Sequence, residues 1–275
     1  RALARAFRPA VIAGTSVHAG RVGRHVGAAS VVVNDDDAAA VPLFARLAYP
    51  SADWIVTPEC LRHEGHGPRQ LTYPGNQQLF YLHPARFAPD PGVRAELGLP
   101  PGAPFALLRL SALQAHHDRG VRGFSAALVE AVRVRLPRHW RLFVSSEKAL
   151  PPALQPLELR LPAERLHHAL AAAEVLLGDS QSTTAEAAVL GTPALRLNDF
   201  VGRISYLAEL ERRGLAFGFR PGQEPDLLAR LEALLAEPGR RAEFAARRER
   251  LLAECGDPLP WLCALLEREG GQRGR

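Results

Sequence analysis

The chain has 275 residues, 47% of them hydrophobic and 23% charged, which is typical of a globular protein with one large core or two smaller ones. The formal net charge is +5, but acidic residues are plentiful and no basic stripe carries interleaved aromatics, which argues against nucleic-acid binding. Three cysteines without CxxC spacing exclude a disulfide framework and favour a cytoplasmic location. No apolar run reaches about 18 residues, so no transmembrane segment is predicted.

The start of the chain has an unusual composition. The chain contains no methionine, and its first residues, Arg-Ala-Leu-Ala-Arg-Ala-Phe, are typical of the end of a helix. Because a complete chain normally begins with methionine, we expect an opening segment to be missing from this sequence.

Short apolar runs dominate the first 84 residues. Runs of strand length alternate with segments of helical composition, which predicts an α/β domain with parallel strands. We expect strands over residues 10–13, 30–33, 53–56 and 71–73 and helices over residues 15–26 and 38–48.

An acidic cluster, Asn34-Asp35-Asp36-Asp37, follows the second of these strands. Carboxylates at the carboxyl end of a strand can hold an acceptor hydroxyl, act as a general base or, less favourably, ligate a divalent ion. The alternative is that Asp37 caps the helix over residues 38–48 while the other acids face water, because Asp is common at helix N-caps. Both interpretations stay open at this point.

A proline-rich segment over residues 85–104 predicts a linker between a first domain, residues 1–84, and a second domain, residues 105–275. The second domain opens with an apolar strand over residues 105–110. The loop after such a strand commonly forms part of a ligand crevice, and this loop carries His117 and Asp118. His117 is a candidate general base, since imidazole changes charge near neutral pH, and the alternative is an ordinary polar surface loop.

The most informative run spans residues 178–193, Gly-Asp-Ser-Gln-Ser-Thr-Thr-Ala-Glu-Ala-Ala-Val-Leu-Gly-Thr-Pro. It lies between apolar segments at residues 175–177 and 194–197. Helix signals stand at both ends: Ser180, Ser182 and Thr183 as possible N-caps, and Gly191 with Pro193 as a stop. The run therefore predicts a strand–helix–strand unit.

A helix N-terminus at the carboxyl end of parallel strands suits a phosphate group, because its free amides and the positive end of its dipole point outward. The hydroxyls of Ser180, Ser182 and Thr183 add donors, and Glu186 lies near enough to accept hydrogen bonds from the attached sugar. The alternative is a capping box, Thr183-x-x-Glu186, which stabilises a helix without any ligand. Neither GxGxxG nor GxxxxGK[ST] is present.

With several other motifs, this run resembles an uncharacterised bacterial and archaeal domain family of unknown function, grouped with GT-B glycosyltransferases and UDP-N-acetylglucosamine 2-epimerases. The similarity covers roughly residues 8–220. The further motifs are Asn198-Asp199-Phe200-Val201-Gly202-Arg203, Val144-Ser145-Ser146-Glu147, His116-His117-Asp118, Tyr81-Leu82-His83-Pro84 and Thr57-Pro58-Glu59-Cys60.

The resemblance implies a GT-B-like α/β fold: two Rossmann-like domains with parallel sheets and an interdomain cleft, with the N-terminal domain incomplete. The first domain would hold the acceptor and the second the nucleotide sugar. The implied catalytic candidates are Asp36, Asp37, His117 and Asp118. The implied nucleotide-sugar-binding residues are Ser180, Gln181, Ser182, Thr183, Glu186, Glu147, Leu161 and Arg203. Of these, Leu161 would lie where backbone groups cradle a uracil, on a strand expected over residues 157–161, and Glu147 either touches the donor sugar or faces water.

The expected activity is transfer of a sugar from a UDP-sugar, such as UDP-N-acetylglucosamine, to an unknown glycan or lipid-linked acceptor. The UDP-sugar is a substrate, and the sequence requires neither a cofactor nor a divalent metal. The alternatives are a 2-epimerase and a non-catalytic nucleotide-sugar-binding protein. Trp261, Leu262, Leu265 and Leu266 either pack the last helix onto the domains or contact a membrane surface peripherally. The arginines at 240, 241, 247, 248 and 250 are expected to form a solvated face.

Overall fold

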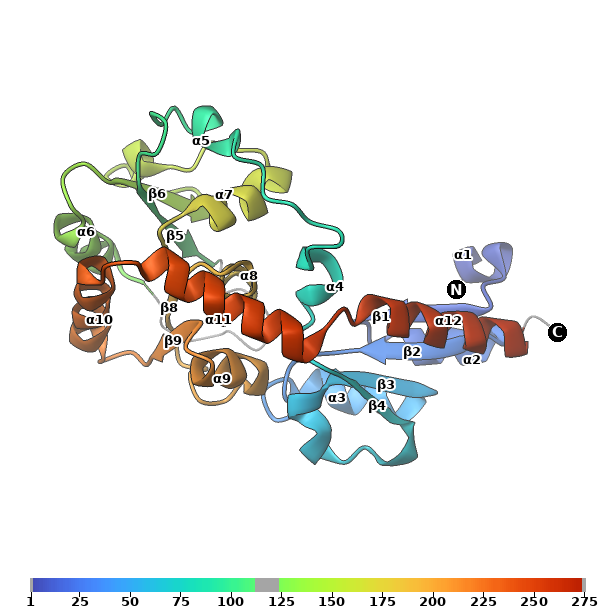
Figure 1. The fold of residues 1–275 in the computed structure, drawn as a ribbon. Coiled ribbons are helices and arrows are strands. Elements are labelled where there is room, and N and C mark those ends of the chain that lie inside the picture. Colours follow the sequence, from blue (N-terminus) through green and yellow to red (C-terminus); the bar gives the residue numbers. More distant parts are fainter. Residues whose placement is uncertain (1, 112–123, 274–275) are drawn as a thin grey trace. The chain divides into compact units, whose positions relative to one another are not determined.

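The computed structural model describes residues 2–111 and 124–273, and the chain divides into two compact units (Figure 1). The first unit comprises Arg1–Phe80, Arg203–Tyr206 and Ala253–Arg275. The second comprises Tyr81–Gly202 and Leu207–Leu252. Each unit contains one sheet of parallel strands, which confirms the expected α/β class with two Rossmann-like sheets.

The first unit is built on a four-stranded sheet in the order β1-β2-β3-β4, with every pair parallel. Its strands are β1 (Val11–Gly14), β2 (Ala29–Val33), β3 (Trp54–Pro58) and β4 (Gln70–Tyr73). The helices around it are α1 (Ala2–Phe7), α2 (Ala19–Val26), α3 (Pro42–Ala48) and α12 (Leu259–Arg273), and α4 (Leu79–Leu82) begins as the unit ends. Short 3-10 helices span Tyr49–Ser51, Glu59–Glu64 and Gly67–Arg69.

Both faces of this sheet are covered, as expected for parallel strands. On β2, Val32 packs with residues of α2 and α3 on one face. Val31 and Val33 point to the other face, where they pack with Leu265 of α12. Successive side chains of a strand alternate between faces, so the apolar run of β2 serves two cores. Figure 1 shows α12 running along β1 and β2.

The second unit is built on a five-stranded parallel sheet in the order β6-β5-β7-β8-β9. Its strands are β5 (Phe105–Leu110), β6 (Arg141–Ser146), β7 (Val175–Gly178), β8 (Ala194–Leu197) and β9 (Ala216–Phe219). Its helices are α5 (Val93–Glu96), α6 (Ala126–Arg135), α7 (Leu166–Ala172), α8 (Gln181–Leu190), α10 (Glu224–Ala236) and most of α9 (Ser205–Arg212) and α11 (Arg240–Cys255). Gln155–Leu157 and Ala163–Arg165 form 3-10 helices.

The strand order of the second unit creates a topological switch point. The chain starts at β5, moves to β6 on one side, and then returns to β7 on the other side of β5. In open parallel sheets, ligands bind at the carboxyl ends of the two strands that flank such a reversal. In this unit those strands are β5 and β7.

The predicted strand over residues 157–161 is wrong. Only Glu158 forms an isolated bridge, with Val144, and the Leu159 amide donates to the Val144 carbonyl at 2.8 Å. Leu157 instead belongs to the 3-10 helix Gln155–Leu157, which has Pro156 in its first turn, so less of the segment is extended than predicted.

None of the described helices is both long enough and apolar enough to cross a bilayer.

Candidate functional site

The N-terminus of α8 lies at the switch point of the second unit, directly after β7. Ser180 is its N-cap: the Ser180 hydroxyl accepts the amide hydrogen of Thr183 at 3.3 Å and donates to the Thr183 hydroxyl at 3.1 Å. Ser180 and Thr183 are buried, whereas Ser182 is exposed and Gln181 partly buried. The first amides of any helix have no intrahelical acceptor, so the Gln181 and Ser182 amides and the Ser182 hydroxyl are the groups suited to an incoming anion.

Asp179, between β7 and α8, was not among the residues predicted from the sequence. Its side chain is buried and accepts the Ser111 amide hydrogen at 2.6 Å, and the Phe124 backbone also bonds to it. Burial raises the pKa of Asp179, and these hydrogen bonds oppose the rise. The Asp179 carboxylate is therefore hydrogen-bonded to the backbone of both Ser111 and Phe124. Its place at the end of a buried strand is the signal that identifies it.

Glu186 lies on α8 beyond the first turn, and its carboxylate contacts two other elements of the second unit. The Tyr81 hydroxyl donates to Glu186 Oε1 at 3.0 Å, and His167 Nε2 lies 3.2 Å from the same oxygen. The capping-box alternative is wrong, because Ser180 rather than Thr183 caps the helix and the Glu186 side chain does not turn back to it. Neither Tyr81 nor His167 is among the site residues predicted from the sequence.

The other predicted nucleotide-sugar residues lie in different settings. Glu147 follows β6 and pairs with Arg109 of β5 at 2.8 Å. Arg109 also donates to the Ser145 hydroxyl at 2.8 Å, which places a cation at the carboxyl edge of the sheet. Leu161 is partly buried just before the 3-10 helix Ala163–Arg165, and Arg203 is exposed and belongs to the first unit. His117 and Asp118 lie outside the described residues.

In the first unit, Asp35, Asp36 and Asp37 follow β2. Both oxygens of Asp37 are engaged by Ser205, the first residue of α9: the Ser205 amide donates to Oδ2 at 2.7 Å and its hydroxyl donates to Oδ1 at 2.6 Å. Asp37 does not cap α3, which begins at Pro42 after Val41. The Asp36 carbonyl oxygen accepts a hydrogen bond from the Asn34 side chain at 2.7 Å. The predicted catalytic roles of Asp36 and Asp37 stay predictions.

The surroundings of Asp35 raise the pKa of its carboxyl group. Burial, the larger cause, and the neighbouring charge of Asp36 raise the pKa of Asp35 to about 7, against hydrogen bonds from its own amide and from Gln78. Gln78 and Tyr73 beside it are buried, at 4% and 0% exposure. A carboxyl group with a pKa near neutrality is suited to proton transfer. In the sequence, Asp35 can be recognised as the first acidic residue after the apolar run of β2.

Within residues 2–111 and 124–273, no cluster of three or more His, Cys, Asp or Glu side chains is arranged to hold a metal ion.

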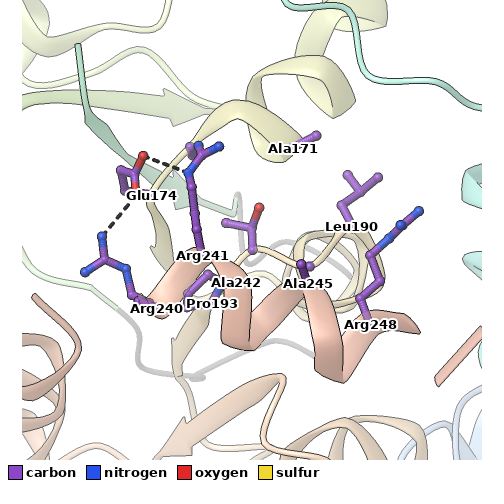
Figure 2. Close-up of a pocket in the computed structure, with 12 residues that line it drawn as sticks. Ala171, Glu174, Leu190, Pro193, Arg240, Arg241, Ala242, Ala245 and Arg248 are labelled. Carbon is purple, nitrogen blue, oxygen red and sulfur yellow. Dashed lines mark hydrogen bonds and ion pairs between the residues drawn. The ribbon is translucent and has the colours of Figure 1, made fainter. Parts of the chain in front are cut away.

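A pocket of about 390 Å³ lies at the amino-terminal ends of β7 and β8 (Figure 2). It is lined by residues that precede these two strands and by residues of α11. Arg240 and Arg241 both pair with Glu174 there, at 3.0 and 2.9 Å. Arg241 also donates to the Ala172 carbonyl and Arg248 to the Val189 carbonyl, near the ends of α7 and α8. Arg240, Arg247 and Arg248 are partly buried and do not fit the solvated face expected of them, whereas Arg241 and Arg250 are exposed as expected. The pocket is separate from the α8 N-terminus.

No known protein-family model matches the sequence, and no curated protein matches it. The structure is similar to the spinosyn rhamnosyltransferase SpnG complexed with thymidine diphosphate, with a TM-score of 0.60 and 18% identity over 96% of this chain and 75% of that one. The spinosyn forosaminyltransferase SpnP gives a TM-score of 0.56 and 20% identity, over 97% and 78% of the two chains. A putative UDP-N-acetylglucosamine 2-epimerase from Listeria monocytogenes gives a TM-score of 0.61 and 17% sequence identity, over 94% of this chain and 71% of that one. The chain is therefore similar in fold to GT-B glycosyltransferases and to a 2-epimerase.

Proposed function

We propose that the protein is a GT-B-type glycosyltransferase that transfers a sugar from a UDP-sugar, such as UDP-N-acetylglucosamine, to a hydroxyl group of a glycan or lipid-linked acceptor. One observation carries the proposal: the N-terminus of α8 emerges at the topological switch point of a parallel sheet, with Ser182 exposed and Glu186 further along the helix. The fold similarity to glycosyltransferases supports it.

The α8 N-terminus would act on the leaving group. In sugar transfer, the bond between the anomeric carbon and a diphosphate oxygen breaks, and negative charge grows on the departing UDP. The Gln181 and Ser182 amides, the Ser182 hydroxyl and the helix dipole would stabilise that charge. We propose that no divalent metal is required, because these donors are preorganised at the helix end.

Asp35 is our proposed proton acceptor, added to the candidates Asp36, Asp37, His117 and Asp118. The acceptor oxygen forms a bond to the anomeric carbon while its proton passes to the Asp35 carboxylate and the bonding electron pair leaves with UDP. A pKa of about 7 leaves a substantial fraction of Asp35 ionised at neutral pH and able to take this proton. Asp37 remains a candidate as well, since Ser205 donates only one hydrogen bond to each of its oxygens.

A 2-epimerase is the second candidate, favoured by the similarity to the Listeria monocytogenes protein. Incubation with UDP-N-acetylglucosamine alone, followed by proton NMR, separates the two reactions. A transferase releases UDP only when a glycan or lipid-linked acceptor is added, whereas an epimerase forms the 2-epimer without any acceptor. Tight UDP binding with neither reaction would indicate a binding protein.

The anion site has a direct mutational test. We expect Ser182→Ala to weaken UDP binding about tenfold or more, since a hydrogen bond to a charged group contributes about 1.5–3 kcal/mol, and to leave uridine binding unchanged. Because Ser182 is exposed and is not the N-cap, the variant should keep its thermal stability. Ser180→Ala removes the cap and should cost about 1 kcal/mol of folding stability as well. Equal losses for UDP and uridine in the Ser182 variant would refute a phosphate site at this helix.

A further inference from the structure

Three side chains of the second unit, Tyr81, His167 and Glu186, form a group that we call the Glu186 clamp. We propose that Tyr81 and His167 are positioning residues that orient Glu186 to accept the ribose hydroxyls of the bound nucleoside diphosphate. This inference rests on the proposed function and assigns roles to two residues outside it.

The clamp joins three separate elements on one oxygen atom. Tyr81 belongs to α4, His167 to α7 and Glu186 to α8, and Tyr81 Oη and His167 Nε2 lie 3.0 and 3.2 Å from Glu186 Oε1. The Tyr81 hydroxyl donates a hydrogen bond to Oε1, and the His167 ring nitrogen lies within ion-pair distance of the same oxygen, so both residues contact Oε1. No hydrogen bond reaches Oε2 from the part of the chain that the structure describes. Oε2 is therefore the acceptor available to a ligand.

Aromatic packing holds the His167 ring in place. The Tyr81 ring lies 5.6 Å from it, and Phe87 meets it edge-on at 6.1 Å with an interplanar angle of 86°. The neighbouring His168 makes different contacts, since it packs on Phe87 at 4.8 Å and its Nδ1 accepts the Asp90 amide hydrogen at 2.9 Å. His167 therefore contacts the Glu186 carboxylate, whereas His168 binds the backbone at Asp90.

The position of the clamp along α8 suits a ribose. Glu186 is six residues beyond the N-cap Ser180, which is about 9 Å along the helix axis at 1.5 Å per residue. That span is comparable to the length of a ribose joined to a diphosphate, so a diphosphate at the helix tip brings the sugar hydroxyls near Glu186. The Glu186 side chain is 13% exposed and that of His167 31%, so solvent reaches the clamp.

The test compares UDP with 2′,3′-dideoxyuridine diphosphate, which lacks both ribose hydroxyls, by calorimetry on the full chain. We expect the wild type to prefer UDP by about tenfold or more, because hydrogen bonds to a carboxylate are strong. Glu186→Gln should abolish most of this preference, and Tyr81→Phe and His167→Leu should each reduce it. His167→Gln should preserve it, because the glutamine amide supplies a donor in place of Nε2. His168→Leu is the matched control and should leave the preference unchanged.

Affinity for the dideoxy nucleotide reports whether each variant is folded, because that ligand does not need Glu186. The proposal is overturned if Tyr81→Phe and His167→Leu keep the full preference for UDP, or if they weaken both nucleotides equally. It is also overturned if the wild type binds the two nucleotides equally, although the proposed diphosphate site would survive that result. Binding of neither nucleotide would overturn this inference together with the proposed function.

Discussion

Two carboxyl groups of the acidic cluster after β2, those of Asp35 and Asp37, lie in different environments. Ser205 donates two hydrogen bonds to Asp37, one to each oxygen of its carboxylate. Burial and the charge of Asp36 favour the neutral form of Asp35. Residues of the same type therefore differ in chemistry because of the atoms that surround them.

Asp35→Asn should change how stability depends on pH. The folded-state pKa of Asp35, about 7, lies above its value of about 3.9 in an unfolded chain, so its contribution to stability is full below pH 4 and is lost as pH rises through 7. The asparagine variant avoids this loss. Its stability relative to wild type should rise by about 2–3 kcal/mol between pH 5 and 8, at 1.36 kcal/mol per pKa unit.

Urea unfolding at several pH values measures this difference. Asp36→Asn is the companion variant: removal of its charge lowers the pKa of Asp35, so the loss of stability should be complete at a lower pH. A difference between Asp35→Asn and wild type that does not vary with pH would contradict a raised pKa.

Local pattern placed Ser180 among three possible helix caps and identified the acids after β2 as a cluster, because both features depend on neighbours in the sequence. It did not identify the partners of Glu186. Tyr81 and His167 lie 105 and 19 positions before Glu186 in the sequence, and only the packing of α4, α7 and α8 brings them to one oxygen. Likewise, Ser205 reaches Asp37 across 168 positions.

At the scale of elements, the close pairing of β7 with β5 depends on a glycine. A Cβ atom added at Gly178 would overlap the carbonyl oxygen of Arg109 on β5, and backbone atoms within a sheet move little. Gly178→Ala should therefore destabilise the second unit by about 1–3 kcal/mol or more, as overpacking does. Gly271→Ala, in α12 with open space around the added methyl group, should be neutral or stabilise by up to about 1 kcal/mol. Chemical denaturation compares the two, and equal stability of Gly178→Ala and wild type would contradict the tight β5–β7 contact.

The elements themselves were largely predictable, since apolar runs of strand length mark buried parallel strands. The observed β2, β5, β7 and β8 match the predicted segments within one residue at each end. The prediction for residues 157–161 failed because they alternate apolar and polar side chains as a strand does, whereas Leu157 lies in a 3-10 helix and only Glu158 forms a bridge. An apolar pattern indicates which side chains face the core, whereas strand pairing also requires an extended backbone.

At the scale of the whole molecule, two parallel sheets were expected from the alternation of strands and helices, but the order of the strands was not. The switch point between β5 and β7 follows from the order β6-β5-β7-β8-β9, which a linear pattern does not contain. The packing of the last helix was one of two expectations, and Leu262, Leu265 and Leu266 do pack against β2 and β3. The sequence did not show that Ala253–Arg275 belongs to the first unit, because that depends on long-range packing.

The central claim is that the N-terminus of α8 binds the diphosphate of a nucleotide. Backbone amide chemical-shift mapping of the labelled protein, titrated with UDP and separately with uridine, tests it most directly. We predict that the amides of Gln181, Ser182 and Thr183 shift strongly with UDP and little with uridine. If these amides stay unmoved while UDP binds, or if they respond equally to both compounds, the diphosphate does not bind at α8 and the account is contradicted.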